Sequence, residues 1–183
     1  MNLSDSLERL KYPLGKYTPI KNPTDHDLKG WINTIELFPQ SIDGLTGNLS
    51  AKELNYKYRP GGWSIKQVVH HCADSHMNAV TRFKLALTEN TPQIRPYFED
   101  RWAELMDAHN DQIDESILIL KGLHPKWSYL LRSLSPEQLQ REYLHPDHGR
   151  KFNLAETIGY YAWHSNHHLQ HIRQALHYKG EFN

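Results

Sequence analysis

The segment "WHSNHHLQHIRQAL", Trp163 to Leu176, contains four of the 13 histidines in the chain. Histidine is the commonest protein ligand for transition metals. On a helix, residues four apart lie on the same side about one turn from each other, so their imidazoles can reach one ion. Two pairs have this spacing, His164 with His168 and His167 with His171. The segment therefore predicts a metal-binding helix without choosing between the pairs.

A third ligand has to come from another part of the chain, because catalytic zinc sites commonly use three protein ligands and leave one position open. The segment "GGWSIKQVVHHCADSHMNAVTRFKLALTE" offers His70, His71 and His76. At about 100° per residue, His71 lies in a polar stripe beside the apolar face, His70 faces solvent and His76 falls on the apolar side. This favours His71. In the C-terminal helix His168 leans toward the apolar face and His167 lies furthest from it, which leaves the choice of pair open.

A solvated cluster of histidines is the alternative interpretation of both segments. The chain has no H-E-x-x-H motif, so it lacks the general-base glutamate of zinc proteases. Cys72 adjoins His71, but its helical position on the apolar face predicts a small core residue and not a nucleophile.

The elements that must position these histidines are predicted to be four helices. Apolar spacing and capping signals predict a helix after Thr24 or Asp25 and a second one after Ser64, where Gln67 completes a capping box. Pro39 is expected to kink or interrupt the first helix. The third helix is expected from about Trp102 to Leu134, bent near Gly122–Pro125, and the last from about Leu154 to Lys179 with a capping box of Asn153 and Glu156.

The rest of the chain supports one all-α domain. Residues 1–23 are expected to form an extended N-terminal arm on the surface, and "REYLHPDHGRKFNL" can hold a short hairpin. We therefore predict a single four-helix-bundle domain, 1–183.

Composition narrows the class of protein further. The 183 residues contain 21 Lys plus Arg and 21 Asp plus Glu, so the formal net charge is zero. The chain therefore has no overall positive charge that would attract nucleic acid or an anionic membrane. One cysteine excludes an intrachain disulfide. No segment resembles a signal peptide or a membrane span. These features predict a cytoplasmic protein.

The segments "YRPGGWSIKQVVHHCADSHMNAVTRFKLALTE", "TPQIRPYFEDRWAEL" and "YAWHSNHHLQHI" resemble the YfiT-type metal-dependent hydrolases of the DinB-like superfamily of four-helix proteins. The resemblance runs from "YPLGKY" to the last helix. It implies one divalent metal per subunit, Zn²⁺ or Ni²⁺, held by His71, His167 and His171. It also suggests a homodimer that acts on a small-molecule substrate.

The resemblance implies a hydrolase in which a metal-activated water is the nucleophile. The family is called a hydrolase family because its members bind a metal. Asp74 and His164 are the nearest polar neighbours that could serve as base or support a ligand. The alternative is a thiol S-transferase that adds bacillithiol, mycothiol or glutathione to an electrophile, with Arg82 as a partner for the carboxylate of the thiol. A third hypothesis is a non-catalytic bundle that binds a metal or a small ligand.

Overall fold

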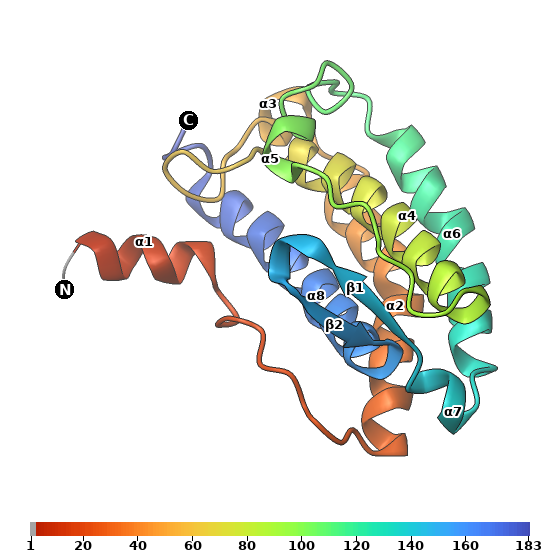
Figure 1. Ribbon diagram of the computed structural model, residues 1–183. Helices are drawn as coiled ribbons and strands as arrows, with labels where there is room; N and C mark the ends of the chain where they lie inside the picture. The colour runs from red at the N-terminus through yellow and green to blue at the C-terminus, as the bar shows by residue number, and fades with distance from the viewer. Residues whose placement is uncertain (1–2) are drawn as a thin grey trace.

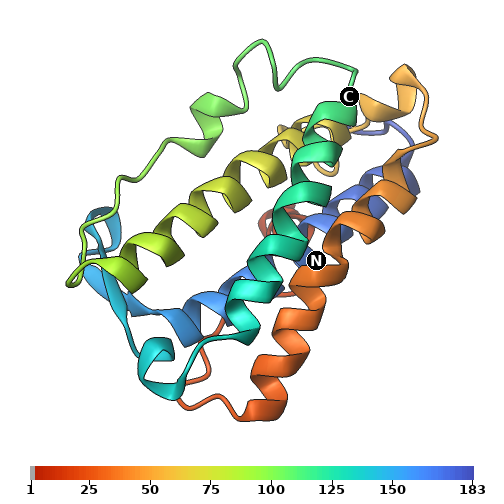
Figure 2. The ribbon, with the colours of Figure 1, turned by 90° about the vertical axis from the view of Figure 1, so that its right-hand side faces the viewer.

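A computed structural model describes residues 3–183 and places four long helices in one bundle (Figures 1 and 2). These helices are α2 (Asp25–Thr46), α4 (Ile65–Thr88), α6 (Asp114–Arg132) and α8 (Leu154–Tyr178). The predicted four-helix bundle is confirmed.

The order of the helices around the bundle differs from their order along the chain. α2 and α4 each pack against both α6 and α8, so α2 lies diagonally opposite α4. Of the consecutive pairs of long helices, α4 and α6 are neighbours, whereas α2 and α4 lie diagonally, as do α6 and α8. This topology places α4 directly beside α8, although the two helices are far apart in the sequence.

Shorter elements cover the ends and one side of the bundle. The strands β1 (Glu142–His145) and β2 (Arg150–Asn153) pair antiparallel, with Glu142 opposite Asn153, which confirms the predicted hairpin. The short helices are α1 (Leu3–Lys11), α3 (Ala51–Leu54), α5 (Glu99–Trp102) and α7 (Pro136–Leu139), with one 3₁₀ turn (Pro146–His148) inside the hairpin.

The helix starts follow the local sequence closely. Ser64 and Gln67 form both halves of the predicted capping box at the start of α4. At α8, the Asn153 side chain accepts from the backbone N–H of Glu156, but the Glu156 carboxylate pairs with Arg150 at 2.6 Å. The predicted second box is therefore half formed.

Three sequence predictions differ from the structure. Pro39 does not interrupt α2, which is continuous from Asp25 to Thr46. The third helix begins at Asp114 and not near Trp102, because the polar stretch 103–112 forms turns after the short α5. The N-terminal arm is extended only beyond Lys11, since it opens with α1.

The arm lies along α8 and is held by hydrogen bonds to it (Figure 1). Gln174 donates to the carbonyl of Leu10 at 2.9 Å, and the hydroxyl of Tyr17 donates to the carbonyl of Glu156 at 3.1 Å. The arm therefore runs antiparallel to α8, with contacts from Gln174 near the end of that helix to Glu156 near its start.

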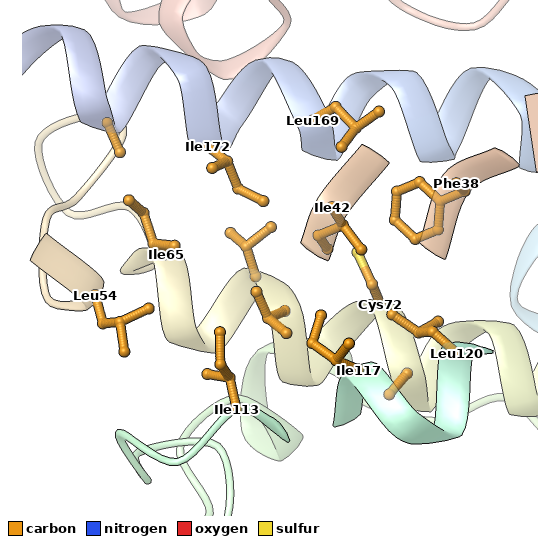
Figure 3. Close-up of a cluster of buried hydrophobic side chains, with 14 of the residues drawn as sticks. Phe38, Ile42, Leu54, Ile65, Cys72, Ile113, Ile117, Leu120, Leu169 and Ile172 are labelled. Atoms are coloured by element: carbon orange, nitrogen blue, oxygen red, sulfur yellow. The ribbon is translucent and has the colours of Figure 1, made fainter. Parts of the chain in front are cut away.

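The core consists of two apolar clusters. One contains Phe38, Ile42, Cys72, Leu120 and Ile172 (Figure 3), which confirms Cys72 as a core residue. The second contains Ile35, Phe83, Trp127, Ile158 and Tyr161. Along α4, α6 and α8, the stretch between the two clusters carries buried histidines. A layer of imidazoles thus separates two hydrophobic cores.

None of the helices within residues 3–183 has a stretch long and apolar enough to cross a membrane. The cytoplasmic location and the homodimer stay predictions.

Gly159 in α8 supplies a first test of the packing. A Cβ at this position would lie 2.9 Å from the Tyr17 hydroxyl and 3.0 Å from the Trp31 ring. Gly159→Ala is therefore expected to lower the free energy of unfolding by at least about 1 kcal/mol, although alanine normally favours a helix. The measurement is urea unfolding followed by circular dichroism.

Gly122→Ala is the matched control, since that exposed glycine of α6 has nothing within 4 Å of an added Cβ. It should stabilise the protein by roughly 0.5–1 kcal/mol. Equal effects at both glycines would contradict the close packing of the arm and α2 on α8.

Candidate metal centre

Three buried histidines from two helices meet between the apolar clusters. His71 comes from α4, and His164 and His168 come from α8. One ring nitrogen of each lies within 4.8 Å of those of the other two. Nε2 of His71 and Nε2 of His164 are 3.3 Å apart. Three imidazoles from neighbouring helices therefore converge on one point.

Helix geometry explains this grouping. The side of α8 that packs against α4 is its apolar side, so the rings nearest that side are the ones that can meet His71. His164 and His168 are four residues apart and lie one turn from each other on that side, with ring centroids 4.4 Å apart in an edge-on arrangement. The four-residue spacing of His164 and His168 and the packing of α8 on α4 together bring the three rings to one place.

The ligand set drawn from the family resemblance is not the set that the structure gathers. It brings His71 together with His164 and His168, and it does not bring His167 and His171 into the same group. The reason is the phase of α8: His167 and His171 are turned from the α4 side toward the N-terminal arm.

Both rings have other surroundings on that side. Nε2 of His171 forms a hydrogen bond with the carbonyl of Lys11 at 3.1 Å. The ring of His171 stacks on Tyr58 with ring centroids 3.8 Å apart. His167 stacks on Trp163 at 4.4 Å. Its buried Nδ1 has no hydrogen-bond partner among the described residues.

Two further histidines of the layer adjoin the site: His76, which the sequence offered as a ligand candidate before His71 was favoured, and His124, which the sequence did not indicate. His76 on α4 lies with its Nε2 3.2 Å from Nδ1 of His164, and His124 on α6 lies with its Nε2 2.8 Å from Nδ1 of His76. Both rings are fully buried. The apolar-side position of His76 was the signal available in the sequence, whereas nothing in the sequence linked His124 to it.

Burial keeps these imidazoles uncharged at neutral pH. Desolvation lowers the pKa of His71 and that of His124 from 6.5 to about 4. It also lowers the pKa values of His164 and His168 well below 6.5, and neighbouring imidazoles add to this effect. A neutral imidazole is the form that binds a metal, so the cluster needs no proton release to bind one.

The donor set fits a divalent transition metal. Imidazole nitrogens suit Zn²⁺, Ni²⁺, Cu²⁺ and Fe²⁺. For tetrahedral zinc with Zn–N of about 2.0–2.1 Å, two ligand nitrogens lie roughly 3.3–3.4 Å apart. The Nε2 atoms of His71 and His164 are 3.3 Å apart, which agrees with the distance between two nitrogen ligands of one zinc ion.

The histidines border a cleft of about 590 Å³. Three carboxylates, those of Glu99, Asp100 and Asp147, also line it, together with Arg82. Arg82 is half-buried, donates a weak hydrogen bond to the Tyr161 hydroxyl at 3.5 Å and has no ion-pair partner among the described residues. The cleft therefore combines a candidate metal centre with groups of both charges.

Asp74, which the sequence offered as a base, does not line this cleft. Burial and the neighbouring Asp107 raise its pKa from 3.8 to about 6. The residue that acts on its charge is thus Asp107, which precedes α6, and Asp74 is not part of the three-histidine group.

Comparisons with known proteins agree with the geometry. Residues 34–172 match the family model of the DinB superfamily. "Putative metal-dependent hydrolase YfiT" of Bacillus subtilis (strain 168) is 42% identical over 165 residues, which are 90% of this chain and 93% of that protein. A Bacillus cereus (strain AH820) protein that is likewise named a "Putative metal-dependent hydrolase" is 46% identical over 163 residues, 89% of this chain and 93% of that protein.

A solved structure is similar over nearly the whole chain. It is that of YfiT from Bacillus subtilis, described as a probable metal-dependent hydrolase with an unusual four-helix bundle topology. The TM-score is 0.91 at 41% sequence identity, and the match covers 94% of this chain and 98% of that chain.

The buried histidines predict how stability depends on pH in the metal-free protein. The unfolded chain binds protons near pH 6.5, whereas folded His71 and His124 bind them only near pH 4. The unfolded state binds more protons between these values, so the free energy of unfolding should fall as pH falls through this window. Each such group contributes up to about 1.4 kcal/mol per pH unit, and Asp74 opposes the trend.

Urea unfolding at several pH values between 7.5 and 4.5, with a chelator present, measures this slope. The variant His124→Phe should show a shallower slope, because it removes one of the titrating groups. A stability that is flat across this range in the wild type would contradict the burial of neutral histidines.

Proposed function

Because this chain belongs to the DinB superfamily and is YfiT-like over most of its length, we propose that it is a metal-dependent hydrolase whose ion is held by His71, His164 and His168. The observation that carries the proposal is the convergence of three buried imidazoles, with ligand atoms within 4.8 Å, at the wall of a large cleft. Zn²⁺ and Ni²⁺ are the ions we expect.

Three protein ligands leave room for a further one on the cleft side. A divalent ion bound there supplies Lewis-acid polarisation of a substrate oxygen and acidifies water. The protein holds its three ligands in buried, fixed positions, so the site is organised before a substrate arrives. Trp63, in contact with His71 at a ring-centroid distance of 4.7 Å, shields one side from solvent.

The remaining residues of the cleft supply binding and proton transfer. The carboxylates of Glu99, Asp100 and Asp147 are the candidate proton acceptors, because they border the same cleft as the histidines. Arg82 is the candidate partner for an anionic group of the substrate, since its guanidinium has no carboxylate within 4.0 Å among the described residues.

Metal binding by single variants tests the ligand set. We expect His71→Ala, His164→Ala and His168→Ala each to weaken Zn²⁺ binding by more than about 100-fold, because losing a ligand exceeds the 10–100-fold cost of losing a group that supports one. The dissociation constants are measured by competition with a chromophoric chelator.

His167→Ala is the matched control, since this ring lies on the same helix and is equally buried, with 6% exposure for both His167 and His164. It should keep Zn²⁺ affinity within a few-fold of the wild type. Strong losses in His167→Ala and His171→Ala with little loss in His164→Ala would instead establish the ligand set drawn from the resemblance.

A thiol S-transferase is the second candidate, and Arg82 is the observation that favours it. A low-molecular-weight thiol with a carboxylate would bring an anion into the cleft, and the Arg82 guanidinium, which has no ion-pair partner within residues 3–183, is suited to bind it. A metal ion lowers the pKa of a coordinated thiol, so the same three histidines serve this chemistry.

Turnover assays separate these functions. As a hydrolase, the Zn²⁺- or Ni²⁺-loaded protein should cleave members of an ester and amide panel without thiol, and a chelator should abolish this activity. Loss of an electrophile only when bacillithiol, mycothiol or glutathione is added, with a raised KM for the thiol in Arg82→Gln, would favour the transferase. Tight metal binding with no turnover in either assay would contradict both enzymatic functions and support a non-catalytic metal-binding bundle.

A further inference from the structure

Two buried histidines lie behind the metal centre and do not border the cleft. His76 and His124 are fully buried, and neither lines the cavity next to His164. They therefore cannot touch a substrate in that cavity. Burying two imidazoles costs free energy unless their ring nitrogens are hydrogen-bonded, so their partners indicate what they do.

These rings form a continuous chain that ends on a main-chain carbonyl. Nδ1 of His164 is 3.2 Å from Nε2 of His76, and Nδ1 of His76 is 2.8 Å from Nε2 of His124. Nδ1 of His124 lies 2.5 Å from the carbonyl oxygen of Ile35. The chain takes one member from each of the four long helices, in the order α8, α4, α6 and α2.

The carbonyl of Ile35 is free because of a proline. In an α-helix this carbonyl would accept from the N–H of residue 39, but Pro39 has no N–H. α2 stays continuous at Pro39 and leaves Ile35 with an unused acceptor inside the bundle. His124 donates to that acceptor, which accounts for a proline in the middle of a buried helix.

The carbonyl sets the proton positions along the whole chain. A carbonyl only accepts, so Nδ1 of His124 carries the proton, and its Nε2 in a neutral ring is an acceptor. His76 must then donate from Nδ1 and accept at Nε2, and His164 must donate from Nδ1. Nε2 of His164, the atom 3.3 Å from Nε2 of His71, is thereby left with its lone pair.

A shorter chain of the same kind ends at His168. Nε2 of His171 donates to the carbonyl of Lys11 at 3.1 Å, which leaves Nδ1 of His171 as an acceptor. Nδ1 of His168 lies 3.4 Å from it and can donate. Lys11 is the last residue of α1, where carbonyls have no partner within the helix.

We propose that the free carbonyls of Ile35 and Lys11 fix the tautomers of His164 and His168, through His76–His124 and through His171, so that both rings present Nε2 to the metal. His76, His124 and His171 are then positioning residues. The inference rests on the proposed function in one respect, that His164 and His168 are ligands.

The tautomers can be read directly by nitrogen-15 NMR of the metal-free protein with labelled histidine at neutral pH. We expect His124, His76 and His164 to be protonated at Nδ1 and bare at Nε2, and His171 to show the reverse pattern. A proton on Nε2 of His164 or on Nε2 of His124 would overturn the proposal. This readout needs no variant and no metal.

Zn²⁺ affinity tests the consequence. His124→Phe and His76→Phe remove the chain while filling the space, and each should weaken Zn²⁺ binding by roughly 10–100-fold. In His124→Phe the NMR signals of His164 should also show a mixture of tautomers. Unchanged Zn²⁺ affinity in both variants, measured in protein that remains folded by circular dichroism, would contradict the proposal.

His70→Phe is the matched control. His70 is a buried histidine of α4 with both ring nitrogens hydrogen-bonded, to Ser116 at 2.8 Å and to the carbonyl of Asn110 at 3.0 Å, but it is not connected to the cluster. It should cost stability and leave Zn²⁺ affinity within a few-fold. An equal loss of affinity in His70→Phe would mean that any buried histidine has this effect, and the proposal would fail.

The two proposals fail in different ways. If His164→Ala keeps Zn²⁺ affinity, the ligand set is wrong whatever the tautomers are. If His164→Ala loses affinity but the tautomers do not follow the chain, the ligand set stands and the positioning role is wrong.

Discussion

Burial of a layer of imidazoles between two apolar cores is the constraint on which the rest of this structure depends. A buried polar ring is tolerated only where its nitrogens have partners, and a buried charge is tolerated even less. The histidines of the layer meet this requirement largely by pairing with one another and with main-chain carbonyls. Among the nitrogens that are not used in these hydrogen bonds are those of His71, His164 and His168 that lie close to one another. The candidate metal centre is thus the place where the network of hydrogen bonds stops.

The topology of the bundle makes this layer possible. Because α2 and α4 lie on one diagonal, each of them contacts both α6 and α8. A residue at mid-height of α4 can therefore contact histidines of α6 on one side and of α8 on the other, as His76 does with His124 and His164. The same diagonal arrangement opens the α4–α8 side to the cleft, where the N-terminal arm and the loop after α4 form its rim.

Features that look unfavourable in the sequence have a use in this setting. Pro39 removes a helical hydrogen bond from α2, and the acceptor it frees binds His124. The helix α1 ends at Lys11, and the carbonyl left at its end binds His171. Each irregularity in a helix thus supplies an acceptor for one imidazole, so backbone geometry and site chemistry are coupled.

The sequence by itself determined the class of fold, the capped start of α4 and the family; it also allowed the hairpin and favoured His71 among the histidines of α4. These features depend on local spacing and on side chains next to each other in the chain, which periodicity can read. It also contained the pair His164 and His168, and it placed His168 nearest the apolar side of its helix. Only the tertiary structure decided that this pair, and not His167 with His171, meets His71, because the choice depends on which face of α8 turns toward α4. It alone also joined His124 and Ile35 to the site, since hydrogen bonds between residues 89 positions apart have no signature in the local sequence.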